Sequence, residues 1–183
     1  NPAARILVAY FTMPESAGVD AVAGASRVVA DGKVYGNTRW VAERILEATG
    51  GSRFVIETAQ KYPAQHDALV KRGEDEKKRN ARPKLAARIE NLDAYDVVFI
   101  GYPVWWTDLP MPLYSFFEDH DFSGKTIIPF STHEGSGFAG TIATIAALEP
   151  KAAVVRNGFT VSRNVVARSG RDIAAWVRGL NLK

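Results

Sequence analysis

Nearly continuous hydrophobic runs recur along the chain, at residues 5–11, 53–58, 96–102 and 126–132. Apolar residues follow one another in these runs instead of alternating with polar ones. Such runs are typical of strands covered on both faces, as in a parallel sheet. A weaker run at residues 152–155, which can extend through residues 159–162, predicts a fifth strand.

Between these runs, the apolar positions recur every three to four residues, which is the period of an amphipathic helix. The pattern predicts helices over residues 38–49, 111–119, 138–148 and 170–180, and a charged connection, helical in pieces, over residues 67–91. Gly50 provides a C-terminal stop for the first helix, and Pro83 should interrupt the charged connection. Ser169 and Asp172 have the spacing of a capping box at the start of the last helix.

Strand and helix therefore alternate five times, which favours an open α/β sheet with right-handed crossovers. The length of 183 residues is consistent with one domain spanning residues 1–183. In such sheets, ligands bind beyond the carboxyl ends of the strands, near the point where the strand order reverses. The loops after the first, third and fourth strands are therefore where a functional site is expected.

The first strand ends at Thr12, but the helix that should follow it begins only near the Gly-Asn-Thr triplet at residues 36–38. We interpret residues 13–35 as an insertion that carries a small hairpin, with a type I′ turn at Asp31-Gly32. The insertion should return the triplet to a position beside Thr12. Such a helix start suits a phosphate group, although Asn and Thr are also good plain helix caps.

The loop after the third strand, "YPVWWTDLPMP", contains the adjacent residues Trp105 and Trp106. Neighbouring side chains on an extended backbone point in opposite directions, so both cannot enter one core. At least one indole should reach the surface or a pocket, where it can receive a flat aromatic ligand. Burial of both beneath a proline-stiffened loop is the alternative.

The loop after the fourth strand, "STHEGSGFAG", is rich in glycine and leads into a helix. Its backbone groups can face the polar edge of a heterocycle. It is not the G-x-S-x-G motif of serine hydrolases, because glycines flank Ser136 directly. His133 either contacts a ligand or caps the turn, and Glu134 is expected to be solvated.

The amino-acid composition excludes several kinds of catalytic and metal site. There is no cysteine, which excludes disulfides, thiolate zinc sites and cysteine nucleophiles. The three histidines lack metal-ligand spacing, and no nucleophile–base pair or carboxylate dyad is visible. The chemistry would then belong to a bound cofactor. No apolar run reaches the roughly 18 residues of a membrane span. A cytoplasmic location is expected, with a removed leader left open because the chain begins with Asn1.

The formal net charge is +3 and the pI is about 9.2. Residues 71–88 hold eight Lys and Arg against three acids, so the rest of the chain is mildly acidic. A basic run can attract nucleic acid or a phosphate-bearing partner, or it can be a solvated helix and loop. The absence of aromatic residues within it argues against a platform for stacking single-stranded bases.

In their order, the segments "VAYFT", "GNT", "FIGYPVWW" and "FSGKTIIPFSTHEGSG" resemble the flavodoxin-like FMN-binding proteins, and more narrowly bacterial flavodoxin family proteins with a Trp-Trp loop. The resemblance covers nearly the whole chain. It implies a doubly wound, five-stranded parallel sheet of order 2-1-3-4-5, with residues 13–35 inserted into the family's short phosphate loop. It implies FMN as the cofactor, with its phosphate on the first loop and its ring between the other two. The implied cofactor-binding residues are Thr12, Tyr35, Gly36, Asn37, Thr38, Pro103, Val104, Trp105, Trp106, Thr132, His133, Glu134, Gly135, Ser136 and Gly137.

Two functions follow from the resemblance. The first is an FMN oxidoreductase that takes electrons from NAD(P)H or another donor and reduces quinone-like or other small acceptors. The second is an electron carrier that docks with a reductase and a protein acceptor and has no substrate of its own. The well-known flavodoxin carriers are strongly acidic. Because this chain is basic, a less negative hydroquinone potential is expected, and the oxidoreductase is favoured.

A flavin-free binding module that uses the basic run is a third interpretation, although no nucleic-acid partner is expected. A phospho-acceptor receiver domain is disfavoured, because the third strand ends in Gly101-Tyr102 where an acceptor Asp would be needed.

Overall fold

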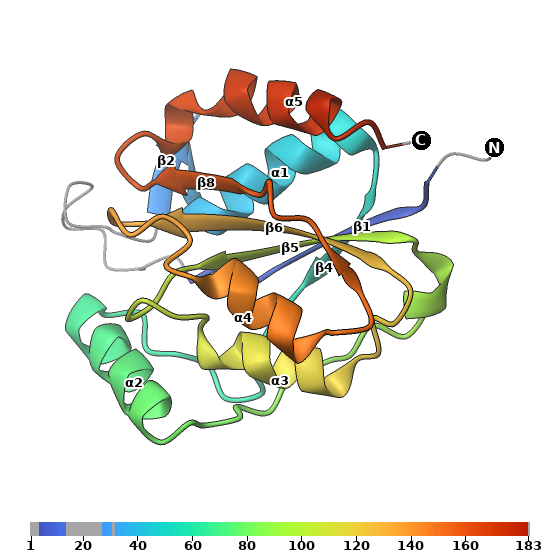
Figure 1. Ribbon diagram of the computed structural model, residues 1–183. Helices are drawn as coiled ribbons and strands as arrows, with labels where there is room; N and C mark the ends of the chain where they lie inside the picture. The colour runs from blue at the N-terminus through green and yellow to red at the C-terminus, as the bar shows by residue number, and fades with distance from the viewer. Residues whose placement is uncertain (1–3, 14–26, 31, 183) are drawn as a thin grey trace.

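The computed structural model of the chain describes residues 4–13, 27–30 and 32–182 (Figure 1). Its main sheet has six strands: β1 (Ile6–Tyr10), β4 (Ser52–Val55), β5 (Val97–Pro103), β6 (Thr126–His133), β7 (Ala153–Val154) and β8 (Phe159–Ser162). The order is β4-β1-β5-β6, with both β7 and β8 pairing to β6, and every pair is parallel. This is the predicted order 2-1-3-4-5, with the fifth position divided in two.

Helices cover both faces of the sheet. On one face lie α1 (Asn37–Thr49) and α5 (Gly170–Gly179); on the other lie α2 (His66–Lys78), α3 (Met111–Asp119) and α4 (Thr141–Leu148) (Figure 1). Successive residues of β1 point to opposite faces. Leu7 and Ala9 therefore join one buried cluster with α3, while Val8 and Tyr10 join the other with α1. Each face of the sheet thus has its own core, as the continuous hydrophobic runs predict.

The fifth predicted strand is interrupted. β7 pairs with the first part of β6 and β8 with its last part, and Pro129 of β6 lies opposite the break. Proline has no N–H to donate to a neighbouring strand. Gly158 approaches this point closely, because a Cβ at Gly158 would lie 2.5 Å from the Pro129 carbonyl oxygen.

Two helix predictions were wrong in detail. α2 ends at Lys78, and residues 79–91 are not helical; they form an isolated bridge through Leu85 before the short 3₁₀ turn η1 (Leu92–Ala94). The capping box of α5 does not form, because the Ser169 hydroxyl donates to the carbonyl of Val166, 2.6 Å away. Val166 belongs to the 3₁₀ turn η2 (Val166–Arg168), and its carbonyl also accepts the backbone N–H of Ser169 at 3.1 Å.

Other local predictions are confirmed. Gly50 ends α1 in the left-handed conformation (φ 68°), and its N–H donates to Leu46 at 2.8 Å. The strands β2 (Arg27–Ala30) and β3 (Lys33–Gly36) form the antiparallel hairpin inside the insertion. Gly32 has φ 72°, while Asp31, the other residue of the predicted type I′ turn, lies outside the described residues. No helix in the described part of the chain is long and apolar enough to cross a bilayer.

Candidate functional site

The two ends of the insertion meet at the carboxyl end of β1. A Cβ placed on Gly36 would lie 1.9 Å from the Oγ1 atom of Thr12. Gly36 has ordinary extended angles (φ −62°, ψ 144°), so glycine is needed here for space and not for an unusual backbone conformation. The prediction that Thr12 and residues 36–38 come together is confirmed.

This junction has the properties of an anion cradle. Gly36 is the N-cap residue of α1, and no side-chain cap forms there among the described residues. The Thr12 Oγ1 atom is buried and has no hydrogen-bond partner in the described part of the chain. The N-terminus of a helix carries partial positive charge. Together with a hydroxyl lacking a partner, it can accommodate a phosphate group.

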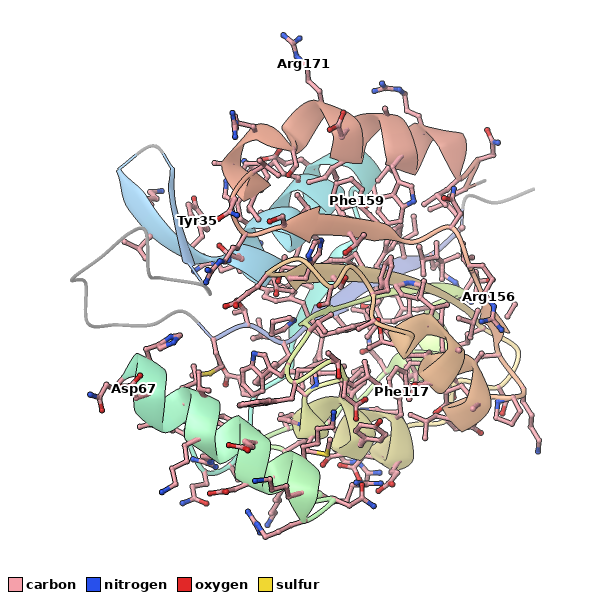
Figure 2. All side chains as sticks on the ribbon, turned by 60° about the vertical axis from the view of Figure 1, so that its left-hand side comes forward. Tyr35, Asp67, Phe117, Arg156, Phe159 and Arg171 are labelled. Atoms are coloured by element: carbon pink, nitrogen blue, oxygen red, sulfur yellow. The ribbon has the colours of Figure 1, made fainter. Side chains whose placement is uncertain are left out.

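A buried hydrogen bond links this cradle to the third loop. The Thr38 and Thr132 hydroxyl oxygens lie 3.0 Å apart, and both residues are buried. Tyr35, in contrast, lies on hairpin strand β3, where its ring is 5.2 Å from the Arg39 guanidinium. Figure 2 shows Tyr35 on the hairpin and Asp67 near the start of α2, on the two sides of the sheet.

The tryptophan loop is a tight and strained turn. Trp105 and Asp108 exchange two backbone hydrogen bonds of 3.0 Å, and the two residues between them, Trp106 and Thr107, have φ of 53° and 58°. Residues other than glycine seldom adopt this left-handed backbone conformation, and each one that does so costs about 1–2 kcal/mol. Two consecutive residues of this kind mark the turn as held in place by its surroundings.

The two indoles have different environments. Trp105 is half-buried and contacts the rings of Phe11 and Tyr62 edge-on, with centroid distances of 5.3 and 5.6 Å. Trp106 is 44% exposed. The prediction that at least one indole reaches the surface or a pocket is therefore confirmed, and the alternative of two core tryptophans is wrong.

Between the second and third loops lies a cavity of about 410 Å³, named here the ring cavity. Its size is within the range of small-molecule sites. It brings together eight of the sequence-predicted residues: Pro103, Val104, Trp105, Trp106, Thr132, His133, Glu134 and Ser136. Gly135 and Gly137 lie in the same loop but do not line it; their φ angles of 138° and 60° let the backbone turn there.

Sequence reasoning missed the third wall of the ring cavity, which α2 provides through His66, Leu69, Val70 and Gly73. One signal was available. An isolated glycine inside a helical pattern costs about 1 kcal/mol relative to alanine, which marks Gly73 as a position to inspect. A Cβ there would lie 3.5 Å from Trp105 and 3.7 Å from Trp106.

His133 both caps the turn and lines the ring cavity. Its Nδ1 atom accepts a 2.8 Å hydrogen bond from the Gly135 N–H, and burial lowers the pKa of His133. The ring is therefore neutral near pH 7, with its proton on Nε2. Glu134 is 59% exposed, as expected, and pairs with Arg163 at 2.8 Å.

Comparison with known proteins agrees with this geometry. Residues 26–180 match the sequence profile of the family described as Flavodoxin. The chain belongs to the flavodoxin family. No curated protein matches its sequence significantly.

Solved structures share the flavodoxin-like fold. The chain is similar to a candidate flavoprotein from Bacteroides eggerthii, with 28% identity, a TM-score of 0.74, and coverage of 98% of this chain and 99% of that chain. A candidate flavoprotein from Bacteroides uniformis has 27% identity, a TM-score of 0.68, and coverage of 91% and 97%. A flavoprotein from Lactobacillus acidophilus, solved in complex with FMN, has 15% identity, a TM-score of 0.64, and coverage of 91% and 98%.

A second cavity of this flavodoxin-family chain, of about 490 Å³, adjoins Thr12. The cationic side chains of Arg39, Arg53 and Lys61 and the acidic side chain of Glu57 line it. The two arginines share one carboxylate, that of Glu43, at 3.5 and 2.7 Å. Cations therefore outnumber acids beside the cradle, and the sequence alone did not place them there.

Behind Trp105, this flavodoxin-family chain buries a carboxylate. Glu76 of α2 is 4% exposed and accepts a hydrogen bond from the hydroxyl of Tyr62, with 2.8 Å to its Oε2 atom. The Arg72 guanidinium lies 4.1 Å from the centroid of the Tyr62 ring. Burial first, and then Glu76, raise the pKa of Tyr62 far above its ordinary value. These contacts fix α2 against the loop that precedes it.

Proposed function

We propose that the chain binds FMN at the cradle and the ring cavity, and acts as an oxidoreductase that passes electrons from NAD(P)H or another donor to quinone-like or other small acceptors. The observation that carries the proposal is the junction of the two parts. The Thr38–Thr132 contact of 3.0 Å joins the N-terminus of α1, where no side-chain cap forms among the described residues, to an aromatic-walled cavity of about 410 Å³. An anionic group attached to a flat ring system matches this combination.

The residues present fit the cofactor. Thr12, Gly36, Asn37 and Thr38 would hold the phosphate, since the Thr12 hydroxyl is buried without a partner and Gly36 leaves room beside it. The segments 103–106 and 132–137 would hold the ring, with Tyr35 beside the first turn of α1. The FMN complex of the Lactobacillus acidophilus flavoprotein supports the choice of this flavin. When bound, FMN supplies hydride and single-electron transfer.

The chain's own groups would serve three tasks. Trp105 and the α2 wall exclude water from one side of the ring cavity. The neutral His133 offers the Nε2 proton as a donor to a polar atom of a ligand. At the mouth, Trp106 and Val70 are 44% and 39% exposed, which provides an apolar rim for a small planar acceptor.

Absorbance titration with FMN tests the first step. The flavin spectrum should shift on binding, and riboflavin, which lacks the phosphate, should bind at least tenfold more weakly. Thr12→Val should weaken FMN binding and leave riboflavin binding nearly unchanged. Equal affinity for both flavins would contradict the phosphate cradle.

Steady-state oxidation of NADPH and NADH with a quinone tests the second step. We expect turnover that requires FMN. If neither nucleotide supports turnover, but a flavodoxin reductase reduces the loaded protein rapidly in stopped-flow experiments, the chain is an electron carrier and the oxidoreductase proposal is wrong.

A further inference from the structure

Three residues of α2 form a stripe against the tryptophan loop. Val70, Gly73 and Lys77 are spaced i, i+3 and i+7, so they lie on one face of the helix. The Trp106 Nε1–H donates to the Val70 carbonyl at 3.2 Å. The Lys77 ammonium donates to the Trp106 backbone carbonyl. Gly73 lies between them, and a Cβ there would be in ordinary contact with the Trp106 indole at 3.7 Å.

The stripe therefore holds Trp106 at both its side chain and its backbone. These contacts matter because the turn has an unfavourable backbone conformation. Trp106 and Thr107 both have positive φ angles, which cost energy for residues other than glycine. The backbone hydrogen bonds between Trp105 and Asp108 close the turn from within. The bonds from Val70 and Lys77 reach it from another element of the fold.

Lys77 does not line the ring cavity, whereas Trp106 does. An effect of Lys77 on a ligand there would act through the indole. We propose that Lys77 is a positioning residue which, with the Val70 carbonyl and Gly73, fixes Trp106 as the outer wall of the ring cavity. It thereby sets how tightly a flat aromatic ring system is held. The inference rests on the proposed function in one respect: it takes the bound ring system to be a flavin or a planar acceptor.

The experiment compares three variants with the parent chain. Lys77→Met removes the donor and keeps the length of the side chain. Lys77→Arg keeps a cationic donor. Lys71→Met is the matched control, because Lys71 is exposed on the same helix and does not line the ring cavity.

Two quantities are measured. The first is acrylamide quenching of tryptophan fluorescence in the protein without added flavin, with Trp106→Phe as the baseline. Trp106 is the most exposed of the four tryptophans, so its release should dominate the change. The second is the dissociation constant for lumiflavin, a flavin ring without a phosphate chain, obtained from flavin fluorescence.

For Lys77→Met, we expect a clear rise in quenching and a lumiflavin dissociation constant raised about fivefold, as for the loss of one charge-assisted hydrogen bond at a partly exposed site. Lys77→Arg should remain within about twofold of the parent, and Lys71→Met should not differ from it.

Unchanged quenching and affinity in Lys77→Met would overturn the inference while leaving FMN binding intact. Failure of Lys77→Arg to restore either quantity would overturn it as well, because the loss would then not depend on the donor. If the parent chain binds neither FMN nor lumiflavin, the proposed function fails. The quenching comparison still decides whether Lys77 positions Trp106.

Discussion

At the scale of single residues, the closest approach in the site is that between Gly36 and Thr12. A Cβ on Gly36 would lie 1.9 Å from the Thr12 hydroxyl oxygen, so Gly36→Ala must displace the Thr12 side chain or the backbone that carries it. We expect Gly36→Ala to lower the free energy of unfolding by roughly 1–3 kcal/mol. Urea denaturation measures this change. The double variant with Thr12→Ala should recover much of the loss, and strict additivity of the two changes would contradict the contact.

Gly73 should behave in the opposite way. Its Cβ would meet the two indoles at 3.5 and 3.7 Å, which are ordinary contact distances, and it lies inside α2. Gly73→Ala should therefore raise the free energy of unfolding by about 0.5–1 kcal/mol, since alanine loses less backbone entropy in a helix. Thermal unfolding checks the sign. A lower melting temperature would mean that the indoles leave no room for a methyl group.

Glu149, which follows α4, gives a pH-dependent prediction. Burial and the nearby Asp121 raise the pKa of Glu149 from 4.5 to about 7. The folded state then binds more protons than the unfolded state between these values, so this residue's contribution to stability falls as pH rises from about 4.5 to 7. Glu149→Gln should stabilise the protein at pH 8 by on the order of 1 kcal/mol, a value discounted for solvent screening. At pH 4 it should have little effect. Denaturant titrations at the two pH values provide the measurement.

At the scale of elements, His120 ties α3 to the irregular segment 79–91. Its Nδ1–H donates to the Phe116 carbonyl at 2.8 Å, and its Nε2 accepts from the Ile89 N–H at 2.9 Å. A protonated ring could not accept that second bond. Burial, the largest cause, lowers the pKa of His120.

Because the folded state of His120 binds a proton less readily than the unfolded state, the contribution of His120 to stability should fall as pH drops below 6.5. Hydrogen exchange of the Ile89 amide should accelerate over the same range, after correction for the intrinsic rate. His120→Gln should flatten the pH dependence. His133, whose pKa burial also lowers, should contribute in the same direction, and Glu149 in the opposite one. An Ile89 amide equally protected at pH 5.5 and 7.5 would contradict this account.

The success of element predictions followed the strength of the local signal. β1, β5 and β6 were predictable because strands buried on both faces are continuously apolar. The edge strand β4 is only partly buried and carried a weaker signal. The division of the fifth strand into β7 and β8 depends on Pro129 in the neighbouring strand β6. Pro129 is too far away in sequence for a local pattern at residues 152–162 to reveal the break. Likewise, α2 carries few apolar residues, so its end at Lys78 was not evident.

At the scale of the whole molecule, charge gives a redox prediction. The net charge of +3 and the excess of cations over acids around the second cavity should favour an added electron on a bound flavin. We expect a hydroquinone potential less negative than those of strongly acidic flavodoxin carriers. Potentiometric titration of the FMN-loaded protein measures it, and a very low second potential would contradict the prediction.

The general location of the site was predictable, whereas its enclosure was not. Parallel strands bring their carboxyl ends to one edge, which placed Thr12, residues 103–106 and residues 132–137 together in advance. The α2 wall and the strained turn at Trp106 arise from packing between elements distant in sequence. The choice between the two tryptophans likewise required the positions of Phe11 and Tyr62.

The near contact of Thr12 and Gly36 bears on how such a chain can diversify. Because the insertion at residues 13–35 begins and ends at almost the same point, it can be lengthened, shortened or exchanged without moving β1 or α1. Loop length adds little entropic cost once the ends are fixed. Evolution, or an engineer who grafts a new recognition segment, can therefore replace this insertion while the rest of the fold is unchanged.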